Sequence, residues 1–214
     1  TTFNQKKIKP GLYSFKKIYT VGELIQNITS VSKNKKKITI LEGENIYNIA
    51  NYLTHGLSIN KDRFIMLCLN EEYIKSLGIP FNLKTLEGFL FPDTYVLFDT
   101  YSEKDVIEIL VKRFMDMYSL HIEPILSKNT LNVFEIITLA SIIQGEAMLV
   151  EEMPTISSVY HNRLKQRMKL EADPTILYYM TPEDLVLFKD EPGSFQSSKV
   201  FKKYKNIENP YNTY

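Results

Sequence analysis

Residues 140–147 read Ala-Ser-Ile-Ile-Gln-Gly-Glu-Ala, and they place a carboxylate in an otherwise apolar helical run. From residue 136 to residue 143 the chain is apolar on nearly every side of a helix, which is typical of a buried helix. Asn132 can cap its start, and Glu135 follows at the spacing of a capping box. We expect this helix to end near Val150, before Pro154.

Glu146 is the chemically unusual residue of this helix. It follows Ile142 by four residues and Leu139 by seven, so it shares their apolar face. Burial and the negative end of the helix dipole both disfavour a charged carboxylate there, and a protonated carboxyl group is what a general acid requires. The alternative is that Glu146 emerges at the helix end and forms a salt bridge with a neighbour.

Composition limits the class of protein. With 214 residues the chain can bury a sizeable core, as one large domain or two small ones. A formal net charge of +1 argues against a general nucleic-acid binder. Cys68 stands alone among apolar residues, so no intramolecular disulfide is expected. His55, His121 and His161 lack the spacing of metal ligands, and we expect no metal and no other cofactor.

The first 85 residues predict short elements. We expect a strand at residues 9–15 and a helix at residues 21–28. The charge run from Lys33 to Lys37 predicts a solvated turn, with contact to a polyanion as the alternative. Further along, the pattern predicts a strand at 38–40, a turn at 42–43, a helix with the apolar stripe Ile46, Ile49, Ala50 and Leu53, and helices at 61–69 and 71–77.

Residues 86–95 read Leu-Glu-Gly-Phe-Leu-Phe-Pro-Asp-Thr-Tyr, which sets two acids and a Thr among large apolar side chains and a rigid Pro. Aromatic walls with a few fixed polar groups commonly line sugar-binding clefts. The alternative is a strand that begins with an Asp-initiated turn.

The second half predicts mainly helices. A surface helix from Ser102 to Tyr118 starts with a capping-box pattern at Asp105, and its apolar stripe is Val106, Ile109, Leu110, Phe114 and Met117. Pro154 opens a helix to about Arg167, on which Arg163 continues an inward-facing stripe. That guanidinium is either paired with an acid or aimed at a ligand. We expect residues 168–179 to be extended and the tail, 188–214, to be mostly loop.

Four blocks in this order resemble the MltG-like (YceG-like) endolytic murein transglycosylases. They are residues 86–95, residues 139–147, residues 159–164 with 168–178, and residues 209–214. Residues 38–43 and the helix after them are similar to the LysM-like subdomain of that family.

The resemblance implies an α+β fold in three segments. We expect an N-terminal strand-helix segment (1–36), a small LysM-like βα subdomain (37–85), and a mixed, helix-rich catalytic domain (86–214). The family continues beyond its Tyr-Asn-Thr-Tyr block, so we expect the C-terminal part of the catalytic domain to be missing here. The first residue is Thr1 and not Met, so we also expect an N-terminal membrane anchor that this chain lacks.

The resemblance further implies a lytic transglycosylase. Such an enzyme cuts the β-1,4 bond between N-acetylmuramic acid and N-acetylglucosamine within nascent peptidoglycan strands, and it leaves a 1,6-anhydro end that terminates elongation. The family motif carries two Glu residues, of which the first is Gln144 here. A Gln cannot donate a proton as an acid, so the assignment of the catalytic acid falls to Glu146. If the family's acid were the first Glu, this chain would be inactive.

The expected substrate-binding residues come from the same four blocks. Amide and hydroxyl groups near the acid come from Gln144, Ser141 and Asn162. The candidates for holding sugar or peptide groups are Arg163, Asp173, Glu87 and Asp93, and the possible walls are Tyr95 and Tyr178. The third and fourth blocks add Thr175 and Asn212.

The expected partners are peptidoglycan strands, with peptidoglycan synthases and elongation or division proteins beside them, and no nucleic acid. The expected location is the cell envelope, at the extracytoplasmic face of the cytoplasmic membrane. Two alternatives belong to other classes: a hydrolysing muramidase, for which Asp93 or Asp173 supplies a second carboxylate, and a non-catalytic peptidoglycan-binding or scaffold protein.

Overall fold

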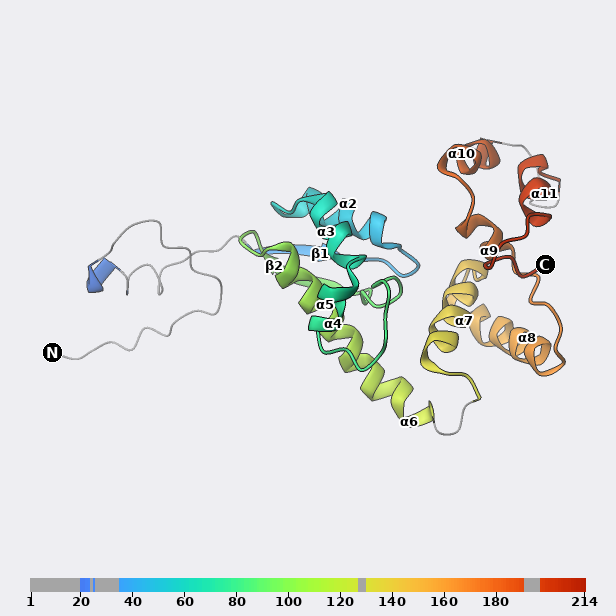
Figure 1. Cartoon of the computed structure of the whole chain (residues 1–214), viewed down its shortest axis with the longest axis horizontal. Helices are drawn as coiled ribbons and strands as arrows, with labels where there is room; N and C mark the ends of the chain where they lie inside the picture. Colours follow the sequence, from blue (N-terminus) through green and yellow to red (C-terminus); the bar gives the residue numbers. More distant parts are fainter. Residues whose placement is uncertain (1–19, 24, 26–34, 127–129, 191–196) are drawn as a thin grey trace. The chain divides into compact units, whose positions relative to one another are not determined.

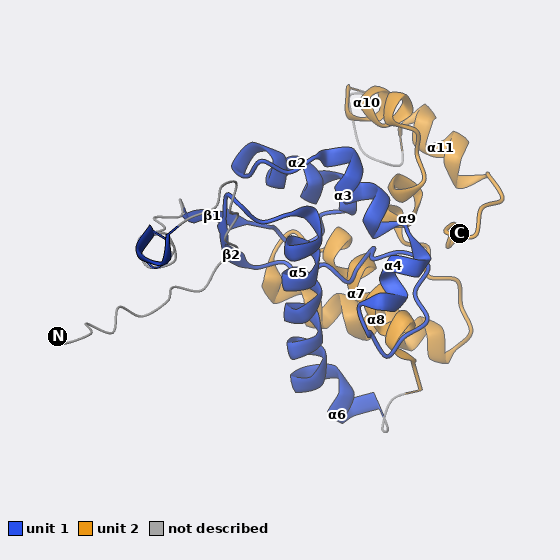
Figure 2. Cartoon of the chain, turned by 60° about the vertical axis from the view of Figure 1, so that its left-hand side comes forward, with its two compact units in different colours: residues 1–127 blue, residues 128–214 orange. Residues whose placement is uncertain are grey.

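A computed structural model of the chain describes residues 20–23, 25, 35–126, 130–190 and 197–214. The chain divides into two compact units, unit 1 (Thr1–Ser127) and unit 2 (Lys128–Tyr214) (Figure 2). The predicted segments 1–36, 37–85 and 86–214 do not coincide with these units, because the strand and helix that follow residue 86 pack within unit 1. The strand predicted at residues 9–15 lies outside the described residues.

Unit 1 is built on a two-stranded antiparallel sheet (Figure 1). Strand β1 (Lys35–Thr39) pairs with β2 (Thr94–Phe98), and Ile38 lies opposite Tyr95. The sheet and the surrounding helices confirm the α+β class. The prediction of a turn at Lys33–Lys37 is wrong for Lys35–Lys37, which lie in β1 with exposed side chains. Pairing with a strand nearly 60 residues away supplies their backbone hydrogen bonds, and such pairing overrides a weak local strand propensity.

The four helices predicted between residues 46 and 117 begin where the sequence predicts, because polar side chains cap them. Asn45, Asn60 and Asn70 each accept a hydrogen bond from a backbone N–H three residues on, and Ser102 forms a complete capping box with Asp105. The helices are α2 (Ile46–Gly56), α3 (Lys61–Cys68), α4 (Glu71–Ser76) and α5 (Glu103–Met117), followed by the π-helical turn Tyr118–Ile122 and α6 (Glu123–Leu126).

The buried residues of unit 1 confirm most of the apolar helix faces predicted from the sequence. All four apolar residues predicted for α2 are buried. On α5 the buried face is shifted: Ile107 and Val111 are buried in place of Ile109 and Met117, which are half-buried. Cys68 is buried, and burial raises the pKa of its thiol to about 12, so this thiol stays protonated at neutral pH.

All regular secondary structure in the described residues of unit 2, 130–190 and 197–214, is helical. Its helices are α7 (Val133–Glu146), the short 3-10 turn Val150–Glu152, α8 (Met153–Lys165), α9 (Asp173–Tyr178), α10 (Pro182–Asp190) and α11 (Lys199–Lys205). Buried residues of α7 and α8 form one apolar cluster with Ala172, and residues of α9 and α11 form a second.

Three predictions for unit 2 are wrong. Helix α7 ends at Glu146 and not near Val150. Residues 173–178 form helix α9, because Pro174 is accommodated in a first turn, where its missing N–H costs no hydrogen bond. The tail contains α11, which Ser198 caps and which buries Phe201 and Tyr204. No helix within the described ranges is long and apolar enough to cross a bilayer.

Candidate functional site

Helix α7 carries Glu146 as its last residue. The predicted capping box is confirmed: the Asn132 side chain accepts hydrogen bonds from the N–H groups of Phe134 and Glu135, and the Glu135 carboxylate accepts one from the Asn132 N–H. A cap of this kind stabilises a helix by about 1 kcal/mol. At the other end Ala147 turns into extended backbone, so Glu146 lies at the C-terminus of the helix.

One carboxylate oxygen of Glu146 is held by two donors. Its Oε1 accepts a hydrogen bond of 2.8 Å from the Tyr160 hydroxyl and one of 3.2 Å from the Asp173 N–H. Its Oε2 accepts no hydrogen bond from any described residue, and the salt bridge considered as an alternative is not formed with any of them. Glu146 is half-buried, and only one of its two carboxylate oxygens is held by hydrogen bonds from described residues.

Tyr160 is the donor from α8, and it is 6% exposed within the apolar cluster of unit 2. Burial, followed by the hydrogen bond to Glu146, raises the pKa of Tyr160 well above its ordinary value. The hydroxyl therefore keeps its proton at physiological pH and acts as a donor.

The turn that presents the Asp173 N–H is held by the C-terminal segment. The Glu171 N–H donates to the Thr213 carbonyl (3.0 Å), and the Ala172 N–H donates to Thr213 Oγ1 (2.9 Å). The Tyr214 hydroxyl donates to the Asp173 carboxylate. Two of the blocks identified in the sequence, about 40 residues apart, therefore contact each other beside the acid.

Thr175 and Gly145 complete this packing. Thr175 is buried, and its hydroxyl donates to the Ala172 carbonyl (2.6 Å) and lies 3.0 Å from Thr213 Oγ1. Gly145 lets α7 and α9 approach closely, because a Cβ at this position would lie 2.7 Å from Cβ of Pro174. A side chain of any size here would push against the turn that carries Asp173.

Arg163 is paired with an acid, which decides between the two alternatives left open by the sequence. Its Nη1 donates to Glu171 Oε2 (3.0 Å) and to the carbonyls of Lys169 (2.7 Å) and Leu170 (3.2 Å). Glu171 has a φ of 53°, in the left-handed region that side chains rarely adopt. The guanidinium thus fixes a strained loop that leads directly into the Asp173 turn.

The other predicted residues of unit 2 have mixed surroundings. Ser141 is exposed and donates to the Thr138 carbonyl, while Gln144 is half-buried and Asn162 exposed. Tyr178 is exposed and packs edge-on against Tyr211, with the ring centroids 4.9 Å apart. The Asn212 amide donates to the carbonyls of Lys205 and Ile207. Contact of these residues with a substrate stays a prediction.

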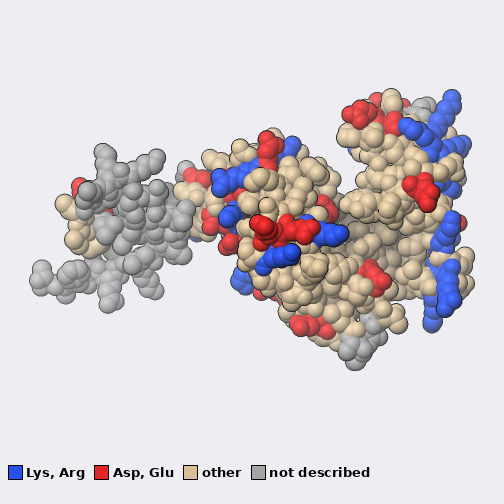
Figure 3. All heavy atoms as spheres, viewed as in Figure 1, with Lys and Arg blue, Asp and Glu red and all other residues tan. Residues whose placement is uncertain are grey.

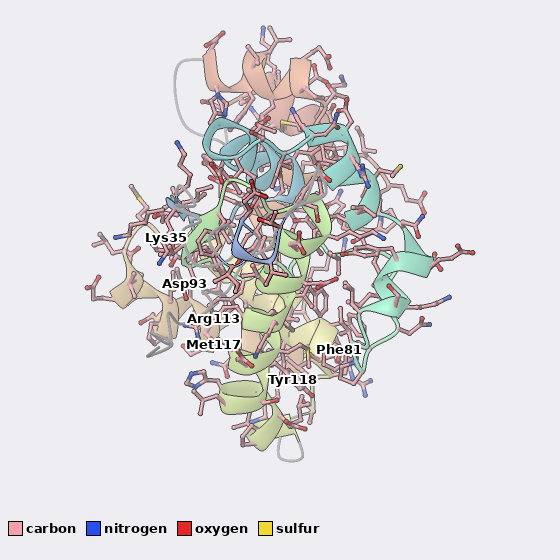
Figure 4. The ribbon with its side chains drawn as sticks, turned by 90° about the vertical axis from the view of Figure 1, so that its left-hand side faces the viewer. Lys35, Phe81, Asp93, Arg113, Met117 and Tyr118 are labelled. Carbon is pink, nitrogen blue, oxygen red and sulfur yellow. The ribbon has the colours of Figure 1, made fainter. Side chains whose placement is uncertain are left out.

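The three candidates in unit 1 make local structural contacts. Glu87 Oε2 accepts from the Ile46 N–H (3.2 Å) at the start of α2, and the Tyr95 hydroxyl donates to the Phe91 carbonyl (2.5 Å). Asp93 accepts from the Thr94 N–H (2.7 Å) and from Arg113 Nε (2.8 Å); Asp93 and Arg113 are labelled in Figure 4. Asp93 lies at a bend directly before strand β2, so a strand follows it as in the alternative interpretation of this block. A role of these residues in binding a substrate stays a prediction.

We expect Glu87→Gln to raise the free energy of unfolding near neutral pH. Burial raises the pKa of the Glu87 carboxyl group, and the Ile46 N–H opposes this shift only in part. The folded state then binds the proton more tightly than the unfolded state, so the stability of the native protein falls as pH rises through the folded pKa. The amide retains an oxygen for Ile46 and carries no charge.

Urea unfolding of both proteins at about pH 4 and about pH 7 measures this difference. A difference in stability that does not grow from the lower to the higher pH would contradict the assignment.

Sequence reasoning missed part of the site. No role in the site was predicted for Tyr160, Gly145, Thr213 or Tyr214. Two signals were available: a hydroxyl on a buried aromatic ring needs a partner, and a glycine within an apolar helix often marks a close approach. Among the described residues no three His, Cys, Asp or Glu side chains cluster in the manner of a metal site.

Comparisons with known proteins agree on one family. The model of the YceG-like family matches residues 1–214. An endolytic murein transglycosylase of Bacillus subtilis (strain 168) is 32% identical over 95% of this chain, which covers 57% of that protein. One of Streptococcus pneumoniae (strain ATCC BAA-255 / R6) is 25% identical over 99% of the chain, which covers 41% of it. The chain therefore spans about half the length of these curated relatives.

A crystal structure of a YceG-like protein from Listeria monocytogenes is similar over 91% of this chain and 64% of that one, with a TM-score of 0.65 and 25% identity. The similarity supports the helix-rich fold described above.

Proposed function

This chain belongs to the YceG-like family, and from that premise we propose that it is the part of an endolytic murein transglycosylase that holds the catalytic acid, Glu146. The substrate is a peptidoglycan strand, and the bond cut is the β-1,4 bond between N-acetylmuramic acid and N-acetylglucosamine. The observation that carries the proposal is the geometry at Glu146, where Tyr160 and the Asp173 N–H hold one oxygen and leave the other open.

The proposed reaction needs a single carboxyl group. Protonated Glu146 gives its proton to the glycosidic oxygen as the bond from that oxygen to C1 of the muramoyl sugar breaks. The resulting carboxylate takes the proton from the C6 hydroxyl of the same sugar, whose oxygen forms the new bond to C1. The product is a 1,6-anhydro end, no water is consumed, and the carboxyl group is restored.

Tyr160 and the Asp173 N–H serve the first of these steps. Negative charge develops on Glu146 as it gives up its proton, and both donors already point at Oε1. Donors fixed where charge develops stabilise the transition state more than the ground state. They also orient the carboxyl group so that Oε2 is the oxygen that faces the substrate.

The nature of the product tests the proposal. We expect the full-length protein to convert polymeric peptidoglycan into fragments that end in 1,6-anhydro-N-acetylmuramic acid, each lighter by one water than the hydrolysis product. Mass spectrometry of the released fragments measures this directly. Reducing ends would show a hydrolysing muramidase instead, for which Asp173, whose N–H bonds to Glu146, supplies the second carboxylate. Strand binding without any cleavage would show a scaffold protein.

Finer features follow from the same proposal. We propose that residues 37–85 form a LysM-like module, supported by the order of β1, α2 and α3. The full-length protein would act at the extracytoplasmic face of the cytoplasmic membrane, anchored by a segment outside this chain. It would act beside peptidoglycan synthases and elongation or division proteins. Gln144, Ser141, Asn162 and Tyr178 are the proposed contacts to the glycan around Glu146.

A further inference from the structure

Arg163 is the one half-buried member of a basic run at the end of α8. The run consists of Arg163, Lys165, Arg167 and Lys169, and Lys and Arg side chains gather over this edge of unit 2 (Figure 3). The other three cations are exposed, whereas the Arg163 guanidinium donates its hydrogen bonds to the loop that follows the helix, residues 166–172. Arg163 therefore has the surroundings of a structural contact and not those of a solvated charge.

The loop carries backbone strain near both of its ends. Arg167 has a φ of 56° and Glu171 a φ of 53°, and among the described residues these are the two non-glycine residues in the left-handed region. Such conformations cost free energy and persist only where the surrounding structure holds them. Here a single nitrogen, Arg163 Nη1, donates to the Lys169 and Leu170 carbonyls and to the Glu171 carboxylate. The strained loop is thus held by one side chain at three successive residues.

The residues that Arg163 holds lead directly into the backbone that contacts the acid. Residues 171–173 use three consecutive N–H groups as donors: the first two bond to Thr213, and the third, from Asp173, bonds to Glu146 Oε1 (3.2 Å). Each peptide unit is a rigid plane, so a displacement of the loop moves the N–H groups that follow it. Release of the Arg163 contacts would therefore shift the Asp173 N–H relative to Glu146.

We propose that Arg163 is a positioning residue for the reaction, which keeps the Asp173 N–H aimed at the charge that develops on Glu146. The inference rests on the proposed function, and it gives Arg163 a role different from the sugar or peptide contact predicted from the sequence. The two roles differ in their kinetic effect. A donor that is needed as Glu146 loses its proton contributes to the transition state, so its displacement lowers kcat. A lost contact with the bound strand raises KM instead.

Kinetics of the full-length protein on soluble, uncrosslinked glycan strands tests this role. We expect Arg163→Met, which keeps a long side chain without its charge, to lower kcat for anhydro-product release about five- to twentyfold and to change KM by less than about twofold. Arg163→Lys should restore part of this loss, because an ammonium group has three donors but its side chain is one bond shorter. Lys165→Met removes an exposed cation from the same helix and is the matched control, with native values of both constants.

Amide hydrogen exchange supplies a measurement that does not depend on turnover. In the Arg163→Met protein we expect the Asp173 N–H to exchange at least about fivefold faster, while the N–H groups inside α7 keep their native rates. An equal acceleration in α7 would show a general loss of stability and would overturn the inference, as would a raised KM with native kcat.

Glu171→Gln gives the same test from the other side of the ion pair if Arg163→Met does not fold. It keeps the length of the side chain and removes its charge, and we expect it to lower kcat about two- to fivefold at native KM. Native kcat in both Arg163→Lys and Glu171→Gln would also overturn the inference. Failure of the proposed function is recognised separately, because it appears as the absence of anhydro product from the native enzyme.

Discussion

Glu146→Gln should reduce the formation of anhydro product by about a hundred- to ten-thousandfold, while the fold is retained. An amide cannot give a proton to the glycosidic oxygen, and proton transfer by a positioned side chain contributes about 10²–10⁴-fold to such reactions. The Gln oxygen can still accept from the Tyr160 hydroxyl and the Asp173 N–H, so the packing of α7, α8 and α9 should persist. Release of anhydro fragments and the Tm together measure the two effects.

Glu135→Gln is the matched control for this substitution. It removes a carboxylate from the same helix, and Gln is also suited to its place in the capping box. We expect it to lower the Tm slightly and to leave the product yield unchanged. A Glu146→Gln protein that still forms anhydro ends would remove Glu146 from the mechanism, and the Asp173 carboxylate would be the next candidate.

Local signals in the sequence predicted the starts of α2 to α5, α7 and α8 correctly. The capping pairs at Asn132 with Glu135 and at Ser102 with Asp105 involve residues three apart, so their hydrogen bonds depend on little beyond the helix itself. The placement of Glu146 on the face of Leu139 and Ile142 follows from helical periodicity alone, and both of these neighbours are buried. Capping hydrogen bonds between residues close in sequence, and the faces set by helical periodicity, can therefore be predicted from the sequence.

Contacts between distant segments could not be derived in the same way. The Asp173 turn is held by hydrogen bonds to Thr213 and Tyr214, which lie about 40 residues later in the sequence. No local sequence pattern predicts these contacts. Helix α11 was missed because seven residues carry little periodic signal, and its stability comes from burying Phe201 and Tyr204. The part of β1 at Lys35–Lys37 was also missed, because its backbone hydrogen bonds come from β2, which is distant in sequence.

Gly145→Ala has the second largest expected effect. The sign of the change in the free energy of unfolding shows whether helix propensity or packing between α7 and α9 dominates. Alanine favours a helix over glycine by about 1 kcal/mol, so helix propensity alone predicts a more stable protein. The added Cβ would lie 2.7 Å from Cβ of Pro174, a ring atom that cannot rotate away. We therefore expect a net loss of about 1–2 kcal/mol in the free energy of unfolding, as in other overpacked cores.

The same clash should reduce activity more than stability. To make room, α9 must move away from α7, and it carries Asp173, whose N–H donates to Glu146 Oε1. A displacement of about 1 Å at a catalytic group can cost about a hundredfold in rate, so we expect kcat for anhydro-product release to fall by about ten- to a hundredfold. Ala140→Leu enlarges an exposed residue of the same helix and should change neither quantity much. A Gly145→Ala protein with a raised Tm and native kcat would show that α7 and α9 do not need this close approach, and that the Asp173 N–H does not depend on it.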